Sequence, residues 1–251
     1  MSDVLVKVAE RKRPETDVII DLESKPLSAV LRASTWRSHT RAEYSDFEQA
    51  LVQGVLPRDA YAELMAQSYF IYVALEQAAA TMADHPVAGR MCFAELARTA
   101  AIEADLAFYY GPQWRDAIAP LPITQEYCDR ITEATAAGPG GFIAHHYTRY
   151  LADLSGGVYI DRAIASAYGL DEDGRRFYSF DIPDFDAFKQ GYRKLIDELP
   201  LTQAEQLALI DEAAVAYEFN IELVDQLTQR FGPFEGLDRS EQAGHGHGYH
   251  Q

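Results

Sequence analysis

The sequence predicts an all-α fold, a single bundle of about seven helices. Apolar residues recur at intervals of three and four through most of the chain, and no segment alternates apolar and polar residues for long enough to form a convincing strand. Glycine and proline separate the helical segments from one another. With 251 residues, of which 48% are hydrophobic, the chain can build one sizeable core.

The predicted domain covers residues 26–234. Residues 1–25 mix charge with one short apolar run, so we expect a loosely ordered N-terminal tail. Residues 235–251 are rich in histidine and glycine and cannot pack a core. A weak transition-metal site is the alternative there to a disordered end.

The helices are expected in a fixed order, each ended by a helix-breaking residue. Pro26 suits the first turn of the first helix, and Gly54 ends that helix. Gly232-Pro233 closes the domain. The predicted helices are 26–53, 57–83, 91–110, 124–137, 138–168, 184–198 and 202–230.

Composition excludes several functional classes. The net charge of −17 argues against nucleic-acid binding, which needs a basic surface. No run of apolar residues is long enough for a membrane anchor, and the N-terminus lacks the apolar core of a signal peptide, so we expect a cytoplasmic protein. The two cysteines, Cys92 and Cys128, lie too far apart in sequence to suggest a zinc site or a redox pair.

The helix over 138–168 is unusual because one of its stripes is small and polar. At 3.6 residues per turn, Arg149, Asp153, Gly156 and Gly157 share this stripe, with Ala152 beside it. Each glycine inside a helix costs about 1 kcal/mol relative to alanine. Adjacent glycines are explained by a kink between packed helices or by close approach to a flat ligand, and the acid and arginine on the same stripe favour the ligand.

The first helix holds a candidate iron ligand. His39 and Glu43 are four residues apart and share a face. An imidazole that ligates iron through one nitrogen usually donates its other N–H to an acceptor, and Glu43 is placed to accept it. This spacing alone is a weak signal, and His85, His145 and His146 are competing candidates without such a partner.

Taken together, these two helices resemble those of the heme oxygenases. His39-Thr40-Arg41-Ala42-Glu43 is similar to the proximal histidine motif of that family, and the segment from Tyr147 to Gly157 resembles its distal-helix signature. Further segments resemble that family in the same order along the chain. They begin at Tyr69, at Asp105 and at Phe188, and Asn220-Ile221 follows them. The resemblance extends over most of residues 26–230.

The resemblance implies haem b, as both cofactor and substrate, held between the first helix and the distal helix with His39 as the single protein ligand to iron. The implied reaction consumes O2 and yields biliverdin, carbon monoxide and ferrous iron. No flavin or nicotinamide motif is present, so electrons must come from a separate ferredoxin or flavoprotein reductase. Arg32, Arg37 and Arg41 make a local positive patch over which such an acidic partner is expected to dock.

The resemblance also implies roles for individual residues. Gly156 and Gly157 would let bare backbone lie against the porphyrin, while Asp153 would orient waters that deliver protons. The remaining implied site residues fall into three groups: Tyr72, Arg149 and Asn220 around those waters; Lys189, Arg193 and Arg32 at the haem propionates; and Glu43, Tyr147 and Ala152 against the haem or its ligand.

Ala152 departs from the family pattern, which normally has glycine there. Its methyl group would intrude on the distal space, so the alternative function is a haem-binding or haem-buffering protein with impaired or peroxidase-like turnover. A third interpretation is a thiaminase-like or di-iron member of the same helical superfold. The di-iron version needs several inward glutamate and histidine ligands, and no Glu-x-x-His pair occurs in the chain.

Overall fold

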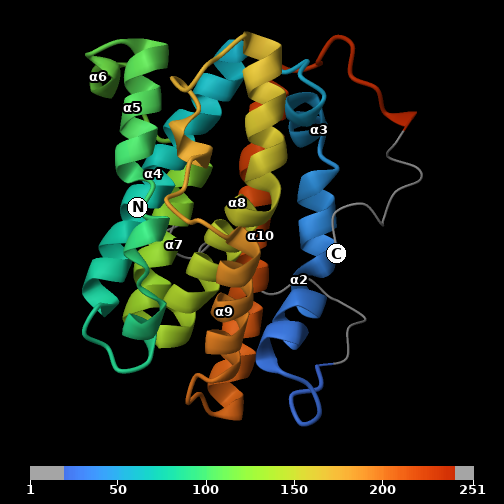
Figure 1. The fold of residues 1–251 in the computed structure, drawn as a ribbon. Coiled ribbons are helices and arrows are strands. Elements are labelled where there is room, and N and C mark those ends of the chain that lie inside the picture. The colour runs from blue at the N-terminus through green and yellow to red at the C-terminus, as the bar shows by residue number, and fades with distance from the viewer. Residues whose placement is uncertain (1–19, 241–251) are drawn as a thin grey trace.

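The computed structural model describes residues 20–240, and all regular structure in this range is helical, which confirms the predicted all-α class (Figure 1). The predicted tails at 1–25 and 235–251 therefore lie largely outside the described residues. The long helices are α2 (Leu27–Glu43), α4 (Arg58–Met82), α5 (Thr99–Tyr110), α7 (Pro122–Ala137), α8 (Pro139–Tyr168), α9 (Phe185–Asp197) and α10 (Gln203–Phe231). Shorter ones are α3 (Asp46–Val52), α6 (Trp114–Ala117) and the 3-10 helices η1 (Ala88–Met91), η2 (Ala94–Leu96) and η3 (Arg176–Tyr178).

The helices α8 and α10 form the centre of the bundle (Figure 1). α10 packs along α8 and α2, while α4 packs against α5, α7 and α8. One continuous core joins these elements, and its largest fully buried side chains include Tyr61, Tyr72, Tyr127, Phe142 and Phe219. None of the helices within residues 20–240 combines the length and the apolar character needed to traverse a bilayer.

The prediction of one helix over 26–53 was wrong, because the chain breaks after Glu43 into α2 and α3. The backbone N–H of Tyr44 still bonds to the carbonyl of Thr40, which closes α2. Ser45 then starts α3, since its hydroxyl accepts a hydrogen bond of 3.3 Å from the backbone N–H of Glu48. The break turns α3 away from the α2 axis and so changes which of its residues face inward.

The prediction of a helix over 91–110 was also wrong, because α5 begins only at Thr99. The buried Arg98 side chain donates to the carbonyls of Leu96 and Ala97 at 3.2 and 2.7 Å. Glu76 on α4 accepts from the backbone N–H groups of Arg98 and Thr99 at 2.6 and 2.8 Å, which caps α5 from a neighbouring helix. These long-range contacts shorten the helix that local periodicity favours.

Buried Asp105 on α5 fixes the connection between α8 and α9. Its carboxylate accepts from the backbone N–H groups of Arg176 and Phe177 at 2.9 and 2.8 Å. Arg98 Nη1 donates to the carbonyl of Phe177 at 3.1 Å. Burial raises the pKa of Asp105 to about 6. This anchoring holds η3, and with it Tyr178, against α8.

The competing histidines all have structural partners. His145 Nε2 lies 2.9 Å from Glu212 Oε1, and Arg130 Nε donates to the same oxygen at 2.8 Å. His146 Nδ1 lies 2.8 Å from the hydroxyl of Tyr192, and burial lowers the pKa of His146 to about 3, so this imidazole is neutral and accepts the hydrogen bond. His85 Nδ1 accepts from two backbone N–H groups of the following turn.

The last described residues pack back onto α3. Gln53 Nε2 donates to the carbonyl of Asp238 at 2.8 Å, and the backbone N–H of Asp238 donates to Gln53 Oε1 at 2.9 Å. Arg239 forms an ion pair with Asp46 at 2.7 Å. The part of the predicted C-terminal tail that the structure describes is therefore held against the start and end of α3.

Replacing Gly141 by alanine is expected to lower the free energy of unfolding by roughly 2–4 kcal/mol. The added Cβ would lie 2.0 Å from the backbone carbonyl oxygen of Ala134 on α7, and backbone atoms cannot rotate away. Urea denaturation followed by circular dichroism measures the change. The matched control is Gly140→Ala, whose Cβ would have its nearest neighbour at 3.6 Å and which should be neutral or stabilising by up to about 1 kcal/mol. Equal losses in the two variants would contradict close α7–α8 packing.

Candidate functional site

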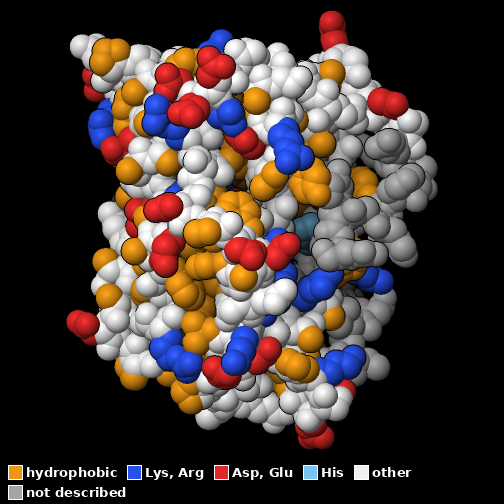
Figure 2. All heavy atoms as spheres, in the orientation of Figure 1, with side chains coloured by type: hydrophobic (Ala, Val, Ile, Leu, Met, Phe, Trp, Pro, Cys, Tyr) orange, Lys and Arg blue, Asp and Glu red, His pale blue; other side chains and the backbone are white. Residues whose placement is uncertain are grey.

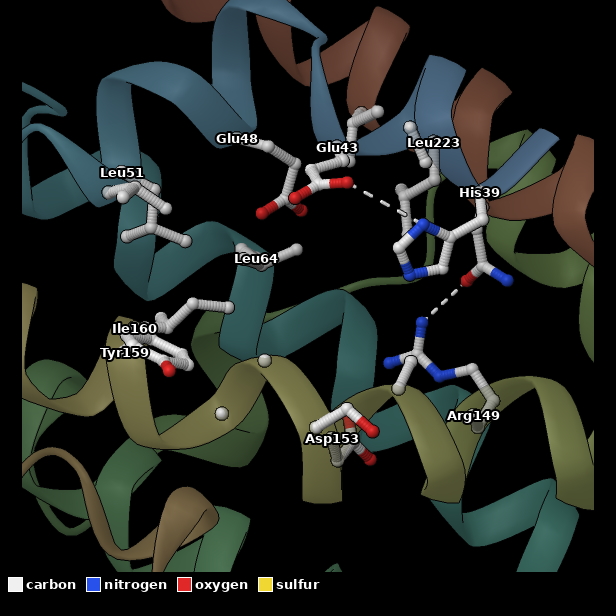
Figure 3. A pocket seen from close by; sticks show the side chains of 18 of the residues that line it. His39, Glu43, Glu48, Leu51, Leu64, Arg149, Asp153, Tyr159, Ile160 and Leu223 are labelled. Atoms are coloured by element: carbon white, nitrogen blue, oxygen red, sulfur yellow. Dashed lines mark hydrogen bonds and ion pairs between the residues drawn. The ribbon is translucent and has the colours of Figure 1, made fainter. Parts of the chain in front are cut away.

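A cavity of about 650 Å³ lies between α2 and α3 on one side and α8 on the other (Figure 3). α4, α10 and η3 complete its walls. This volume falls within the range of about 300–1,000 Å³ that is usual for ligand sites. Seven of the sequence-predicted site residues meet here from α2 and α8, and Asn220 joins them from α10: the cavity is lined by His39, Glu43, Arg149, Ala152, Asp153, Gly156 and Gly157, with Asn220.

His39 enters the cavity from α2 with its ring orientation fixed. Its Nδ1 lies 3.6 Å from Glu43 Oε2. The imidazole plane is within 3° of the Trp36 indole at 5.8 Å between ring centroids, and the edge of Tyr217 approaches it at 6.1 Å. In Figure 3 the other ring nitrogen faces into the cavity. This arrangement turns Nε2 toward the cavity, while Glu43 occupies the side of Nδ1.

The facing wall on α8 contains the two adjacent glycines, which meet different surroundings. A Cβ on Gly156 would have no heavy atom within 4 Å, so this part of α8 presents open backbone. A Cβ on Gly157 would lie 3.0 Å from Cδ1 of Tyr178. Only Gly156 leaves room for a ligand; Gly157 makes room for the Tyr178 ring. α8 runs without interruption through both.

A polar group from three helices lies beside this wall. The hydroxyl of Tyr72 on α4 donates to Asp153 Oδ2, and Arg149 Nη1 donates to Asn220 Oδ1. The Arg149 guanidinium lies 5.0 Å from the centre of the Tyr72 ring. Asn220 in turn donates to the carbonyl of Ala216 at 2.8 Å. The four side chains thus hold one another in place.

Burial and the neighbouring polar groups act on the pKa of Asp153 in opposite directions. Burial raises the pKa of Asp153, while the charge of Arg149 and the hydrogen bond from Tyr72 oppose that rise. The buried Arg149 Nε has no hydrogen-bond partner among residues 20–240. Since buried polar atoms are normally paired, this nitrogen is a position for a water or a ligand atom.

Five predicted residues do not line the cavity: Tyr72, which reaches it only through Asp153, and four residues on α2, α8 and α9. Tyr147 is buried beside Arg32 and Arg193: burial raises the pKa of its hydroxyl, and the two arginines lower it. Lys189 forms an ion pair with Asp186 at 2.9 Å. The structure therefore gathers these cations where α2 and α9 pack together, away from the cavity lining.

Sequence reasoning missed Glu48, which lines the cavity from the first turn of α3 (Figure 3). Burial raises its pKa to about 7, with the charge of Arg149 opposing and those of Glu43 and Asp153 adding to the rise. The sequence predicted one continuous helix over 26–53, and the apolar periodicity of that helix gave no reason to place Glu48 in a cavity. The signal that could have found it is Ser45-x-x-Glu48, a typical helix-start pattern.

Comparison with known proteins gives a consistent result. The family described as heme oxygenase matches residues 25–226. The chain is 38% identical over 202 residues to heme oxygenase 1 of Synechocystis, a match that covers 80% of this chain and 84% of that protein. Its fold is similar to the crystal structure of heme oxygenase-1 from the cyanobacterium Synechocystis in complex with heme, with a TM-score of 0.79, 37% identity, and coverage of 82% of this chain and 94% of that one. Heme oxygenase from Leptospira interrogans is similar with a TM-score of 0.77, 32% identity, and coverage of 80% and 100%.

Tyr72→Phe is expected to raise the pKa of Asp153 further, because it removes a hydrogen bond that lowers it. A carboxyl whose pKa in the folded protein exceeds its unfolded value of about 3.9 stabilises the fold fully below that value, and this contribution is lost as pH rises through the folded pKa. The free energy of unfolding of Tyr72→Phe should therefore fall more steeply than that of the wild type above about pH 4.

Urea denaturation over a pH series measures this difference. Tyr69→Phe is the matched control on the same helix, since the Tyr69 hydroxyl faces Glu103 at 3.4 Å and not Asp153. Parallel pH profiles for the wild type and both variants would show that Tyr72 does not control Asp153.

Proposed function

The chain belongs to the heme oxygenase family, and we propose that it cleaves haem oxidatively to biliverdin, carbon monoxide and ferrous iron, with O2 and with electrons from a separate protein. The observation that supports this best is His39 facing open α8 backbone at Gly156 across the cavity. A planar macrocycle suits this space, because one wall offers an imidazole ligand and the other offers no side chain. We expect the enzyme to act in the cytoplasm.

His39 is the protein ligand to the haem iron in this proposal. Haem bound through His39 supplies the iron that takes up O2 and the meso carbon that is oxidised. Glu43, 3.6 Å from Nδ1, attracts a proton to that nitrogen, so that Nε2, which faces the cavity, would be the ligating atom. Trp36 and Tyr217 restrict rotation of the ring.

Asp153 is the acid of the site. Burial raises the pKa of its carboxyl, and Tyr72 fixes the orientation of that carboxyl. Arg149 is held by Asn220, and its Nε, which has no partner within residues 20–240, would donate to water beside the acid. Together these residues order the water through which Asp153 passes its proton, and the open backbone at Gly156 leaves room for that water.

Cations outside the cavity lining suit the carboxylates of haem. Arg32 and Arg193 lie close enough to influence the Tyr147 hydroxyl, and Lys189 follows on the same helix as Arg193. Charge-assisted bonds from these side chains to the propionates would hold the ring in one orientation in the cavity. That orientation would decide which meso carbon is oxidised.

The alternative is haem binding without turnover, because Ala152 stands where the family normally has glycine. Ala152 does line the cavity. Family membership and the retained Asp153, Gly156 and Tyr72 contacts favour turnover. The two functions differ in product: only an oxygenase converts bound haem to biliverdin.

Electrons are expected to enter over α2. Arg32, Arg37 and Arg41 are exposed there on a protein of net charge −17. Figure 2 shows basic side chains gathering across the lower part of the face formed by α2 and α9. Arg41 also forms an ion pair with Glu218 on α10, which tempers its charge. An acidic ferredoxin or a flavoprotein reductase suits this face.

The proposed function is tested by adding haem, a reductant and O2 to the wild type and to His39→Ala. The wild type should show the absorption spectrum of a histidine-ligated ferric haem and then release biliverdin, identified by chromatography. His39→Ala should lose that spectrum and at least about 100-fold of the turnover, because the iron has no other protein ligand. A stable haem spectrum in the wild type after reductant and O2 would favour the haem-buffering alternative.

Arg37→Glu should weaken reductase-supported turnover roughly tenfold at low ionic strength while leaving haem affinity unchanged, because the charge attracts the partner and does not contact the substrate. Stopped-flow reduction at several salt concentrations measures the effect, which should shrink as salt rises. Arg162→Glu, an exposed change on the distant half of α8, is the matched control. Equal rates in the two variants would place the docking surface elsewhere.

A further inference from the structure

Glu48 is a carboxyl of the cavity that the proposed chemistry does not use. It extends from the first turn of α3 into the cavity, where apolar side chains of Leu51, Leu64 and Ile160 lie around it (Figure 3). No hydrogen bond or ion pair from within residues 20–240 reaches its carboxyl oxygens; only its backbone N–H is bonded, to Ser45. The acid is thus held by its backbone and is free to interact inside the cavity.

An unpaired carboxyl in apolar surroundings needs a partner. Leaving such a group without a hydrogen bond is unfavourable, and more so for the ionised form. Water fills this role where the space is polar and large enough. The cavity meets both conditions, because its volume is about 650 Å³ and a second carboxyl and a guanidinium face it.

The charged and titratable groups that influence Glu48 come from every neighbouring wall. The charges of Glu43 on α2 and Asp153 on α8 raise the pKa of Glu48, and that of Arg149 on α8 lowers it. Glu48 in turn raises the pKa of the Tyr178 hydroxyl on η3. Glu48, Asp153 and Gly156 line the same cavity, and a Cβ at Gly156 would meet no atom within 4 Å. The α8 wall at Gly156 therefore leaves open space in the cavity that the two carboxyls share.

We propose that Glu48 is a second proton-exchanging acid of the site, joined to Asp153 by water that occupies the open space over Gly156. This inference rests on the proposed function and adds a residue to it. Glu48 does not touch the reacting atoms; it acts through Asp153, which makes it a positioning and proton-supplying residue.

The step moves one proton and no electrons. Asp153 gives its proton to the site and becomes a carboxylate. Protonated Glu48 then donates to the intervening water, which passes a proton to an Asp153 carboxyl oxygen, so Asp153 is restored and Glu48 becomes the carboxylate. Glu48 regains its proton from solvent at the mouth of the cavity. The raised pKa of Glu48, about 7, keeps a protonated fraction present near neutral pH.

The first arm of the test uses the ligand-free protein. Infrared difference spectra between the wild type and Glu48→Gln, taken from about pH 5 to about pH 9, should isolate a protonated-carboxyl band that disappears with a midpoint near 7; bands of other buried carboxyls such as Asp105 cancel in the difference. In Asp153→Asn the midpoint of this difference band should fall, because the negative charge of Asp153 is gone. An unshifted midpoint, or the absence of such a difference band, would overturn the coupling.

The second arm measures haem turnover against pH. In the wild type the rate should fall as pH rises through about 7, and Glu48→Gln should lose this step and turn over roughly three- to tenfold more slowly below it, less than the 10²–10⁴-fold expected for a directly acting acid. Glu48→Asp should restore the pH step. Glu133→Gln, an exposed acid on α7, is the matched control and should match the wild type.

The outcomes separate the two proposals. Turnover by Glu48→Gln with the rate and pH profile of the wild type would overturn the inference and leave the proposed function intact. If the wild type itself made no biliverdin, the proposed function would fail, and the infrared arm would still decide whether Glu48 and Asp153 are coupled. Haem titration of each variant confirms that it is folded.

Discussion

Open backbone on α8, opposite the only cavity-facing histidine within residues 20–240, is the constraint on which the rest of the structure depends. A helix interior glycine is unfavourable by about 1 kcal/mol relative to alanine, so packing must stabilise α8 elsewhere. Gly141 lets α8 approach the backbone of α7, and Gly157 admits the Tyr178 ring from η3. Both contacts hold α8 against its neighbours in the bundle. Gly156 makes no such contact, so no side chain covers the backbone there. The flat wall is therefore a result of how the whole helix is packed and not of one local substitution.

The polar group beside that wall ties chemistry to the register of three helices. Tyr72 comes from α4, Arg149 and Asp153 from α8, and Asn220 from α10. In a low-dielectric interior an unpaired member would destabilise the fold by its full desolvation cost, so each helix is held at the position where its polar side chain meets a partner. The same burial that makes the pairing necessary raises the pKa of Asp153. One arrangement thus specifies the packing and prepares an acid.

Much of this was predictable where local signals and tertiary packing agree. Proline and glycine mark the ends of α4, α8 and α10, and the 3.6-residue period placed Arg149 and Asp153 on one face of α8. Prediction failed where a distant side chain decides the local structure: Glu76 and Arg98 set the start of α5 through bonds to other segments. It failed at Glu48 for a local reason, because apolar spacing continues across Ser45 and hides the helix start there. The different surroundings of Gly156 and Gly157 depend on Tyr178, more than twenty residues along the chain, and no sequence period contains that information.

The break between α2 and α3 affects how charged side chains of the protein are distributed around the cavity. Arg32 lies two turns before His39 and is gathered with Arg193 near Tyr147, whereas Glu43 and Glu48 follow His39. Had the helix continued to residue 53, Glu48 would not have been turned into the cavity by the Ser45 cap. In the folded chain, the arginines lie on the N-terminal side of His39 and the two glutamates on its C-terminal side. A flat molecule with carboxylates on one edge is attracted on the first side and repelled on the second, so the charges that stabilise its binding also select its orientation. In the proposed reaction Asp153 would act from the α8 wall, so the orientation favoured by α2 and α3 would determine which edge of the ring Asp153 can reach.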